Sequence, residues 1–255
     1  MILARIQRSE SYQPHPSQYG GIKDRSTTEA LVTLVEKVRD SSQKYVFLLL
    51  FDVSKAFDRM WWPAVKIALL EANLPPGMLA LVCSFLQDRR ACLNEYGAQC
   101  VLNVEMGCPQ GSVLGPYLWT RLFDQLLVRL ADSRLQPLAF VDDLAVLLEG
   151  QTKSSIEEQG RQAVAIIEDW CSLVKLQIAS SKTVQCQLKG KLNTRSPPVI
   201  AIGGNNIRHN STPKYLGVIL EKDLNPSAHT TETVGKALAK FGRTKSLSGV
   251  TWGTT

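Results

Sequence analysis

The 255-residue sequence lacks a long hydrophobic run, and this absence excludes a membrane-spanning helix. The longest apolar run in the first half of the chain, YVFLLLF (Tyr45–Phe51), is seven residues, whereas a membrane helix needs about 20. Residues 1–20 are polar and carry no apolar core segment of the kind that secretory signals have. We therefore expect an intracellular protein, in the nucleus or the cytoplasm, that is neither secreted nor embedded in a membrane.

The sequence also lacks the residue spacing of a zinc site. Its six cysteines include no C-x-x-C pair, and the chain has only three histidines, so no zinc finger or Cys/His cluster is indicated. With 44% hydrophobic residues, a chain of this length can build its own core without a disulfide framework. We expect reduced thiols. No internal repeat or low-complexity tract is present.

Acidic residues are scarce in the C-terminal third. Residues 182–255 contain 11 Lys and Arg against 3 Asp and Glu, a net charge of +8. Residues 1–181 contain 18 against 20, which leaves −2 and recovers the total of +6. A basic third beside a slightly acidic body indicates a polyanionic partner. A solvated basic surface would give the same pattern, so charge alone does not decide between the two interpretations.

Hydrophobic periodicity divides the chain into helices and strands. A helical spacing of apolar residues over 26–39 precedes the run YVFLLLF, which is typical of a buried strand. The glycine-rich stretch Gly107–Trp119 opens into a long helix, and Ser155 with Glu158 predicts a capping box for another. The other expected elements are an arm without periodicity at 1–22, a helix from Pro63 to before Pro75, a helix at 77–87, a hairpin at 91–106, two strands within 138–148, a helix body up to 174, strands at 184–188, 199–202 and 215–220, and a basic helix at 230–246.

These elements mix helices and strands without a regular strand–helix alternation. Such an order favours an α+β fold with a largely antiparallel sheet, and it is compatible with a split βαβ core. In a core of this kind, the strand that ends at Asp52 and the hairpin that carries Asp142 and Asp143 could lie side by side.

Two adjacent carboxylates interrupt the apolar segment LAFVDDLAVLL, residues 138–148. At a separation of about 4 Å, two like charges repel by roughly 4 kcal/mol at an effective dielectric of about 20, and burial adds to this. Aspartate tolerates the left-handed backbone of a tight turn, which explains at least one of the pair without any function.

A functional explanation appears when Asp52 is added to Asp142 and Asp143. Three carboxylates at one edge of a sheet would repel one another strongly unless cations compensated them. Hard cations such as Mg²⁺ take oxygen ligands and need only one or two carboxylates each, together with substrate phosphates. Two such ions suit in-line phosphoryl transfer. The three aspartates therefore predict a two-metal site.

Three motifs in order carry a resemblance to a known family. They resemble the palm motifs of reverse transcriptases, and most closely those of the non-LTR, or LINE-type, retrotransposon branch. The motifs are DVSKAFD (Asp52–Asp58), GCPQGSVLGP (Gly107–Pro116) and FVDD (Phe140–Asp143). Flanking segments agree, and they are QYGGIKDRSTTEAL (Gln18–Leu31), KLQIASSKT (Lys175–Thr183) and KYLGVIL (Lys214–Leu220).

The resemblance implies a right-hand polymerase palm with partial fingers and the start of a thumb. Residues 1–45 would be a partial fingers segment, and residues 46–205 the palm with inserted finger helices. Residues 206–255 would hold the primer-grip hairpin and a truncated thumb. Finger strands are expected to precede residue 18 in this family. The endonuclease and most of the thumb of the retrotransposon polyprotein would lie outside this chain.

The resemblance also implies a role for each matching residue. Asp52 and Asp142 would bind two Mg²⁺ ions, with Mn²⁺ as a possible substitute, and the backbone carbonyl of Val53 would be a further ligand. Asp143 would support the metal site, whereas Asp58 would fix the local turn.

Nucleotide and primer contacts follow in the same way. Phe57 would exclude a ribose 2′-OH and so select deoxynucleotides, although core packing also explains a phenylalanine there. Gln110 and Gly111 would lie against the incoming nucleotide and the template, and Lys182 would assist departure of pyrophosphate unless it is an ordinary surface lysine. The primer-grip residues would be Lys214, Tyr215, Leu216 and Gly217.

The expected function is that of an RNA-directed DNA polymerase, which adds dNTPs to a DNA primer on an RNA template. The sequence departs from the family where Val141 replaces the more usual Ala and where QYGG replaces Gln-x-Gly-Phe. Three alternatives stay open. They are an inactive retroelement remnant that only binds nucleic acid, another two-metal phosphotransferase such as a nuclease, and a reverse transcriptase of the group II intron type.

Overall fold

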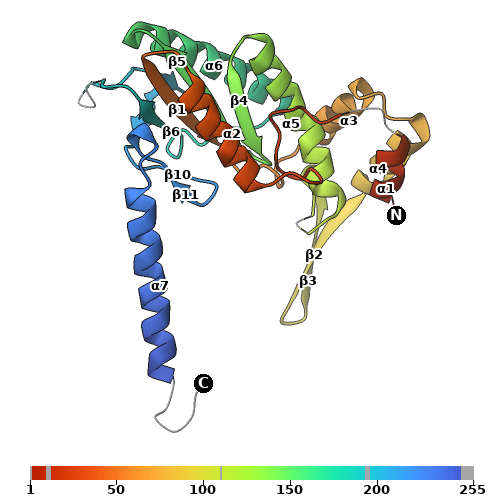
Figure 1. Ribbon diagram of the computed structural model, residues 1–255. Helices are drawn as coiled ribbons and strands as arrows, with labels where there is room; N and C mark the ends of the chain where they lie inside the picture. Colours follow the sequence, from red (N-terminus) through yellow and green to blue (C-terminus); the bar gives the residue numbers. More distant parts are fainter. Residues whose placement is uncertain (1, 10–12, 110, 193–195, 248–255) are drawn as a thin grey trace.

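The computed structural model describes residues 2–9, 13–109, 111–192 and 196–247. In Figure 1, helices cover both faces of a central sheet, and the β2–β3 hairpin and helix α7 project away from this body. The helices are α1 (Ile2–Ser9), α2 (Thr27–Asp40), α3 (Trp62–Glu71), α4 (Pro76–Leu86), α5 (Leu114–Asp132), α6 (Lys153–Val174), the 3-10 turn η1 (Lys222–Leu224) and α7 (Ser227–Leu247). The strands are β1 (Tyr45–Asp52), β2 (Arg89–Glu95), β3 (Ala98–Val104), β4 (Gln136–Phe140), β5 (Asp143–Gly150), β6 (Val184–Lys189), β7 (Ala201–Ile202), β8 (Asn205–Asn206), β9 (Arg208–His209), β10 (Lys214–Tyr215) and β11 (Val218–Ile219).

The central sheet has the strand order β4-β5-β1-β6-β9. Strands β4, β5, β1 and β6 pair antiparallel, and only the short β9 runs parallel to its neighbour β6. The chain leaves β1, forms α3, α4, the β2–β3 hairpin and α5, and returns to the same sheet through β4 and β5. The predicted α+β fold with a largely antiparallel sheet is confirmed.

Strand β1 is apolar along its whole length because helices bury both of its faces. Phe47 and Leu49 belong to the larger core cluster, which α5 and α6 complete on one face. Val46 and Leu48 belong to a second cluster with the apolar side of α2 on the other face (Figure 1). Alternate residues of a strand point to opposite faces, so both faces need apolar side chains. This explains the unbroken run YVFLLLF.

The N-terminal segment differs from the expectation in part. Residues 1–22 were expected to form an arm or an incomplete element without periodicity, but Ile2–Ser9 forms the helix α1. Ile6 is fully buried in the larger core cluster, and Leu3 packs against that cluster. A helix of eight residues gives too short an apolar pattern to be recognised by periodicity, so the tertiary contact is what reveals it.

The start of α6 also differs from the expectation. Its N-cap is Thr152, and the capping box joins Thr152 to Ser155 instead of Ser155 to Glu158. Ser155 N donates to Thr152 Oγ1 at 3.1 Å, and Thr152 N donates to Ser155 Oγ at 3.3 Å. A serine at the third helical position replaces the usual Glu or Gln, which is why the sequence pattern was assigned three residues too late.

The two projecting elements carry exposed apolar side chains. Leu93, Tyr96 and Leu102 are exposed on the β2–β3 hairpin, and Leu238 and Phe241 on α7. Among the described residues, no helix combines the length and the apolarity that crossing a membrane would require.

Candidate active site

Of the three aspartates predicted to converge, two lie opposite one another on neighbouring strands and the third lies in the adjoining turn. Asp52 is the last residue of β1 and Asp143 the first residue of β5, and the two are direct partners in the antiparallel register. Asp142 precedes Asp143 in the turn that joins β4 to β5. Residues opposite one another in an antiparallel pair have Cβ atoms about 5 Å apart. The fold therefore brings all three carboxylates to the same end of the sheet.

A turn after α6 brings a lysine to the same place. Ala179 N donates to the carbonyl of Asp52 at 2.8 Å, and Lys182 N donates to the carbonyl of Ala179 at 3.0 Å. This turn directs the side chain of Lys182 back over β1, where Nζ lies 2.9 Å from Asp52 Oδ2. The hydrogen bond to Asp52 and the charge of Asp52 raise the pKa of Lys182. Lys182 thus belongs to the aspartate cluster, although its side chain is 72% exposed.

The turn that carries Asp142 has an unusual backbone. Val141 has a φ of +60°, a value that β-branched residues rarely adopt. Neither Asp142 nor Asp143 has a positive φ in the described chain, so the expectation that an aspartate takes the left-handed position was wrong. Such a backbone costs roughly 1–3 kcal/mol and persists only where its surroundings impose it. Here Trp119 Nε1 donates to the carbonyl of Val141 at 2.9 Å, and Gln18 contacts the same residue.

Burial, and after it the charges of neighbouring aspartates, raises the pKa values of both aspartates at the turn. Desolvation raises the pKa of Asp142, opposed by a hydrogen bond from its own backbone and reinforced by the charge of Asp52. Desolvation, together with the charges of Asp142 and Asp52, raises the pKa of Asp143. Asp143 is exposed, whereas Asp142 is half-buried. In both cases a nearby cation would favour the charged form.

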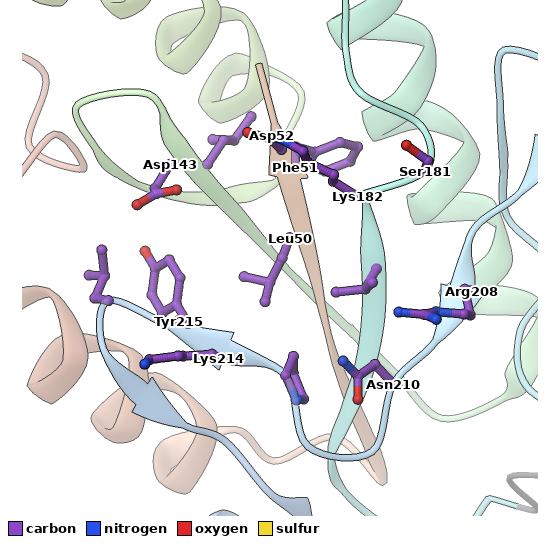
Figure 2. Close-up of a pocket in the computed structure, with 14 residues that line it drawn as sticks. Leu50, Phe51, Asp52, Asp143, Ser181, Lys182, Arg208, Asn210, Lys214 and Tyr215 are labelled. Carbon is purple, nitrogen blue, oxygen red and sulfur yellow. The ribbon is translucent and has the colours of Figure 1, made fainter. Parts of the chain in front are cut away.

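A cleft of about 480 Å³ opens beside the aspartates. Asp52, Asp143 and Lys182 line one wall, and Lys214, Tyr215 and Leu216 of the β10–β11 hairpin line the other (Figure 2). In Figure 2 the hydroxyl of Tyr215 points toward Asp143. Burial, followed by the charges of Asp143 and Tyr19, raises the pKa of Tyr215. Asp52 and Asp143 therefore face the predicted primer-grip residues Lys214, Tyr215 and Leu216 across one cleft, whereas Asp142 is not among the residues that line it.

The β10–β11 hairpin has a two-residue loop. Tyr215 pairs with Val218, which leaves Leu216 at φ +46° and Gly217 at φ +85° between the strands. Positive φ at both loop residues is the type I′ pattern, which suits the twist of a hairpin and favours glycine. Gly217 does not line the cleft. Its place in this turn explains its presence in the motif.

The motif at Phe57 and the glycine-rich loop are bonded to each other. Cys108 N donates to the carbonyl of Phe57 at 2.9 Å, and Gly107 N donates to that of Met60 at 2.8 Å. A Cβ on Gly107 would lie 2.5 Å from the carbonyl oxygen of Asp58, so only glycine fits there. The half-buried ring of Phe57 lies 5.8 Å from that of Trp119. Packing therefore holds Phe57 in place, and it does not line the cleft in Figure 2.

Not every predicted residue joins the cleft. Gly111 has a φ of +82° in an open stretch of the glycine-rich loop, with no atom near the position that a Cβ would take. Gln110 falls outside the described residues. Val53 is buried and forms an isolated bridge with Ile178, which fixes its backbone next to Asp52.

Some residues of the site were missed by the sequence reasoning. Ser181, Arg208 and Asn210 also line the cleft. Arg208 lies in β9 and pairs with Val184 of β6, an addition to the sheet that no motif marks. Its only sequence signal is its place in the basic C-terminal third. Gln18 was quoted as part of a motif without any role.

The oxygen donors of the cluster fit hard divalent cations by their chemistry. Asp52 Oδ2 is buried and lies 2.9 Å from the Lys182 ammonium, so a positive charge is already present beside this oxygen. Carboxylate oxygens are the ligands that Mg²⁺ takes. Among the residues that the structure describes, no three His, Cys, Asp or Glu side chains are already arranged around one point as a metal site. The predicted pair of ions stays a prediction.

Comparison with known proteins decides the family. The model of the family described as reverse transcriptase (RNA-dependent DNA polymerase) matches residues 1–220. The chain belongs to the reverse transcriptase family. The match includes residues 1–17, which the motif resemblance left out.

The similar curated proteins come from insect non-LTR retrotransposons. The chain is 31% identical over 92% of its length to the putative 115 kDa protein of the type-1 retrotransposable element R1DM of Drosophila melanogaster. It is 28% identical over 99% of its length to the Pol polyprotein of element R1 of Bradysia coprophila, and 27% identical over 91% to the RNA-directed DNA polymerase of the mobile element jockey of Drosophila funebris. It spans only 23%, 25% and 26% of those proteins.

Solved structures support the fold of this reverse transcriptase chain. Apo telomerase of Candida tropicalis, truncated from its C-terminal domain, superposes with a TM-score of 0.59 at 14% identity over 88% of this chain and 43% of that one. Candida albicans telomerase in complex with a telomeric RNA fragment gives a TM-score of 0.57 at 14% identity, over 88% of this chain and 37% of the other. At such identities the likeness concerns the fold alone.

Proposed function

We propose that this chain is the palm region of an RNA-directed DNA polymerase, which adds dNTPs to the 3′-OH of a DNA primer on an RNA template. One observation carries the proposal. The antiparallel pair Asp52 and Asp143 faces the hairpin residues Lys214 and Tyr215 across a single cleft. Acidic groups at one wall and a basic, aromatic hairpin at the other suit a primer end held beside a phosphoryl-transfer site.

Asp52, Asp142 and Asp143, with the carbonyl of Val53, would hold two divalent ions. Reverse transcriptases generally use such ions, and when bound they polarise phosphate oxygens and activate a hydroxyl as nucleophile. Mg²⁺ is the expected ion. Asp142 and Asp143 bind such ions in their charged form, and a nearby cation would favour that form against the burial and the like charges that raise their pKa values.

The remaining residues of the chain would position the substrates. Lys182 Nζ lies beside Asp52, and its positive charge would neutralise the departing pyrophosphate. Phe57, fixed by packing on Trp119 and by the loop at Cys108, would block a ribose 2′-OH. Lys214 and Tyr215 would hold the primer end. Gln110 and Gly111 would lie against nucleotide and template.

The domain division is part of the same proposal. Residues 46–205 would be the palm with inserted finger helices, residues 1–45 a partial fingers segment, and residues 206–255 the primer grip and the start of a thumb. The exposed apolar side chains of the β2–β3 hairpin and of α7 are compatible with further protein or nucleic acid packing on these projections. The choice of RNA template and of genomic target would depend on the whole retrotransposon protein.

Primer extension on an RNA template tests the proposal. Asp142→Asn keeps the shape of the side chain and removes its charge, so we expect incorporation of dNTPs to fall by about 10²-fold or more. Asp169→Asn is the control, since it removes the charge of an aspartate in the same way but at a site away from the β4–β5 turn, where Asp169 pairs with Arg129 at 2.8 Å. Undiminished synthesis by Asp142→Asn would reject the proposal. RNA binding without incorporation by the unaltered chain would favour an inactive remnant.

A further inference from the structure

The turn between β4 and β5 depends on contacts from outside the hairpin. Val141 and Asp142 form a two-residue loop between the paired residues Phe140 and Asp143. The positive φ of Val141 is one that glycine adopts without strain and a β-branched side chain does not. Because the loop carries Asp142 and is followed directly by Asp143, its conformation sets where both carboxylates lie.

The side-chain amide of Gln18 holds this residue from both sides of its backbone. Gln18 Oε1 accepts from Val141 N at 3.0 Å, and Gln18 Nε2 donates to the carbonyl of Val141 at 3.4 Å. The same Oε1 accepts from Gly20 N at 3.0 Å. Gln18 is fully buried. A buried polar side chain that directs its donor and its acceptor at one residue fixes that residue in place.

The chain around Gln18 is built into the sheet at this point. Ala139 N donates to the carbonyl of Ser17, and Tyr19 N donates to the carbonyl of Ala139, both at 2.8 Å. This short stretch therefore lies parallel to β4 as an added edge. A Cβ on Gly20 would lie 2.3 Å from Val141 N, so Gly20 is the residue that allows such a close approach.

Arg25 supports the stretch from the far side. Its Nη1 donates to the carbonyl of Gln18 at 2.5 Å and to that of Pro16 at 2.9 Å, and its guanidinium lies over the ring of Tyr19. Arg25 thus holds the backbone of the stretch from which the side chain of Gln18 contacts Val141.

We infer that Gln18 is a positioning residue of the active site, which fixes the Val141 backbone and thereby places Asp142 and Asp143 for metal binding. The inference deepens the proposed function and rests on it. Gln18 touches peptide groups of the turn and neither carboxylate, so it acts through Val141. This role is comparable to that of a residue that hydrogen-bonds to a metal ligand and orients it without touching the metal.

Substitution by methionine tests this role, because methionine keeps the length of glutamine and removes its hydrogen bonds. We expect Gln18→Met to weaken Mn²⁺ binding, measured by electron paramagnetic resonance without substrate, and to raise the half-saturating Mg²⁺ concentration for primer extension, each by about tenfold. Gln18→Asn keeps the amide but falls one methylene short, and it serves if the methionine variant does not fold. Circular dichroism checks folding.

Gln185→Met is the matched control. Gln185 is as buried as Gln18, and its Nε2 donates to the carbonyls of Pro198 at 2.9 Å and Ile207 at 3.0 Å. Its loss should lower stability and leave the affinity for Mn²⁺ within about twofold. Equal weakening of Mn²⁺ binding by Gln18→Met and Gln185→Met would overturn the inference, since any buried glutamine would then matter alike.

A rescue experiment separates a local role from a general one. Val141→Gly lets the turn adopt its positive φ without strain, so in that background we expect Gln18→Met to weaken Mn²⁺ binding by only about twofold. An equal loss of affinity with Val141 and with Gly at that position would show that Gln18 does not act through this turn.

Different experimental results would reject the role of Gln18 and the proposed polymerase function. If the unaltered chain extends no primer, the polymerase proposal fails, yet the Mn²⁺ affinities of the two glutamine variants still decide the role of Gln18. If primer extension proceeds and folded Gln18→Met binds Mn²⁺ as the unaltered chain does, the role of Gln18 is rejected and the polymerase proposal stands.

Discussion

The ammonium of Lys182 lies 2.9 Å from a carboxylate oxygen of Asp52 and balances the charge that a divalent cation would balance. The ion pair is exposed on the lysine side, so it is weak and can be exchanged. In the proposed reaction, Lys182 would release Asp52 when divalent ions bind, and its ammonium would then be available to a phosphate.

The first prediction concerns this exchange. Lys182→Gln should bind Mn²⁺ tighter, by about two- to fivefold, since an exposed ion pair of this kind no longer competes for Asp52. The same variant should extend a primer more slowly, because a charge beside the departing pyrophosphate is missing. Mn²⁺ titration and single-turnover extension measure the two effects. Weaker Mn²⁺ binding together with unchanged extension would show that Lys182 only shapes the site.

The second prediction concerns Phe57. Phe57→Val should raise the efficiency of ribonucleotide incorporation relative to deoxynucleotides by about tenfold or more, as expected when a steric block of a few methylenes is removed. It should also lower the free energy of unfolding by roughly 1 kcal/mol, since the contact with the Trp119 ring is lost. Competition between the two nucleotide types measures the ratio. A loss of stability with an unchanged ratio would leave Phe57 as a packing residue.

The third prediction concerns the β10–β11 turn. Gly217→Ala places a side chain at φ +85°, which should destabilise the hairpin by about 1–2 kcal/mol and weaken primer binding. Gly77→Ala is the control, because Gly77 lies in α4 with open space around it, and alanine there should be neutral or stabilising by up to about 1 kcal/mol. Thermal unfolding and primer affinity are measured for both. Equal behaviour of the two variants would contradict the turn assignment.

The fourth prediction concerns pH. Burial raises the pKa of Asp124 to about 7, against a small opposing effect of the hydrogen bond from the backbone of His15. The folded state then binds the proton more tightly than the unfolded state. Stability from this group is complete below pH 4 and is lost as pH rises to about 7, by up to about 4 kcal/mol.

Asp124→Asn should remove this slope. The lowered pKa of His15, caused first by its burial and then by Arg25, acts in the opposite direction below about pH 6.5, so the difference between the two proteins is the quantity to compare. Urea unfolding between pH 4 and pH 8 measures it. Parallel curves for both proteins would mean that Asp124 is ionised throughout.

Sequence reasoning located the cluster because strand patterns end where the aspartates begin. The apolar run to Asp52 and the hairpin at Asp142 each have a clear local signal, and antiparallel pairing of the two follows from the α+β order. The ion pair of Lys182 with Asp52 could not be derived in this way, because it depends on a turn whose direction is set by one hydrogen bond from Ala179 to Asp52.

The contacts of Gln18 were hidden for a different reason. Nothing in its neighbourhood along the chain shows that its amide meets Val141, since the two come together only when the chain around Gln18 joins the edge of β4. The positive φ of Val141 was equally hidden, because local preference would assign such a backbone to an aspartate or a glycine. Contacts between distant segments decided both features.

The direct pairing of Asp52 with Asp143 has a consequence for how this protein can vary. Strand side chains alternate between the two faces of a sheet. An insertion or deletion of a single residue within β1 would therefore turn Asp52 to the opposite face of the sheet and bring an apolar neighbour to the cleft. Replacing one apolar residue of this strand by another should leave Asp52 at the cleft. Among related copies of such an element, an insertion or deletion in this strand should therefore mark a copy that has lost the Asp52–Asp143 pair.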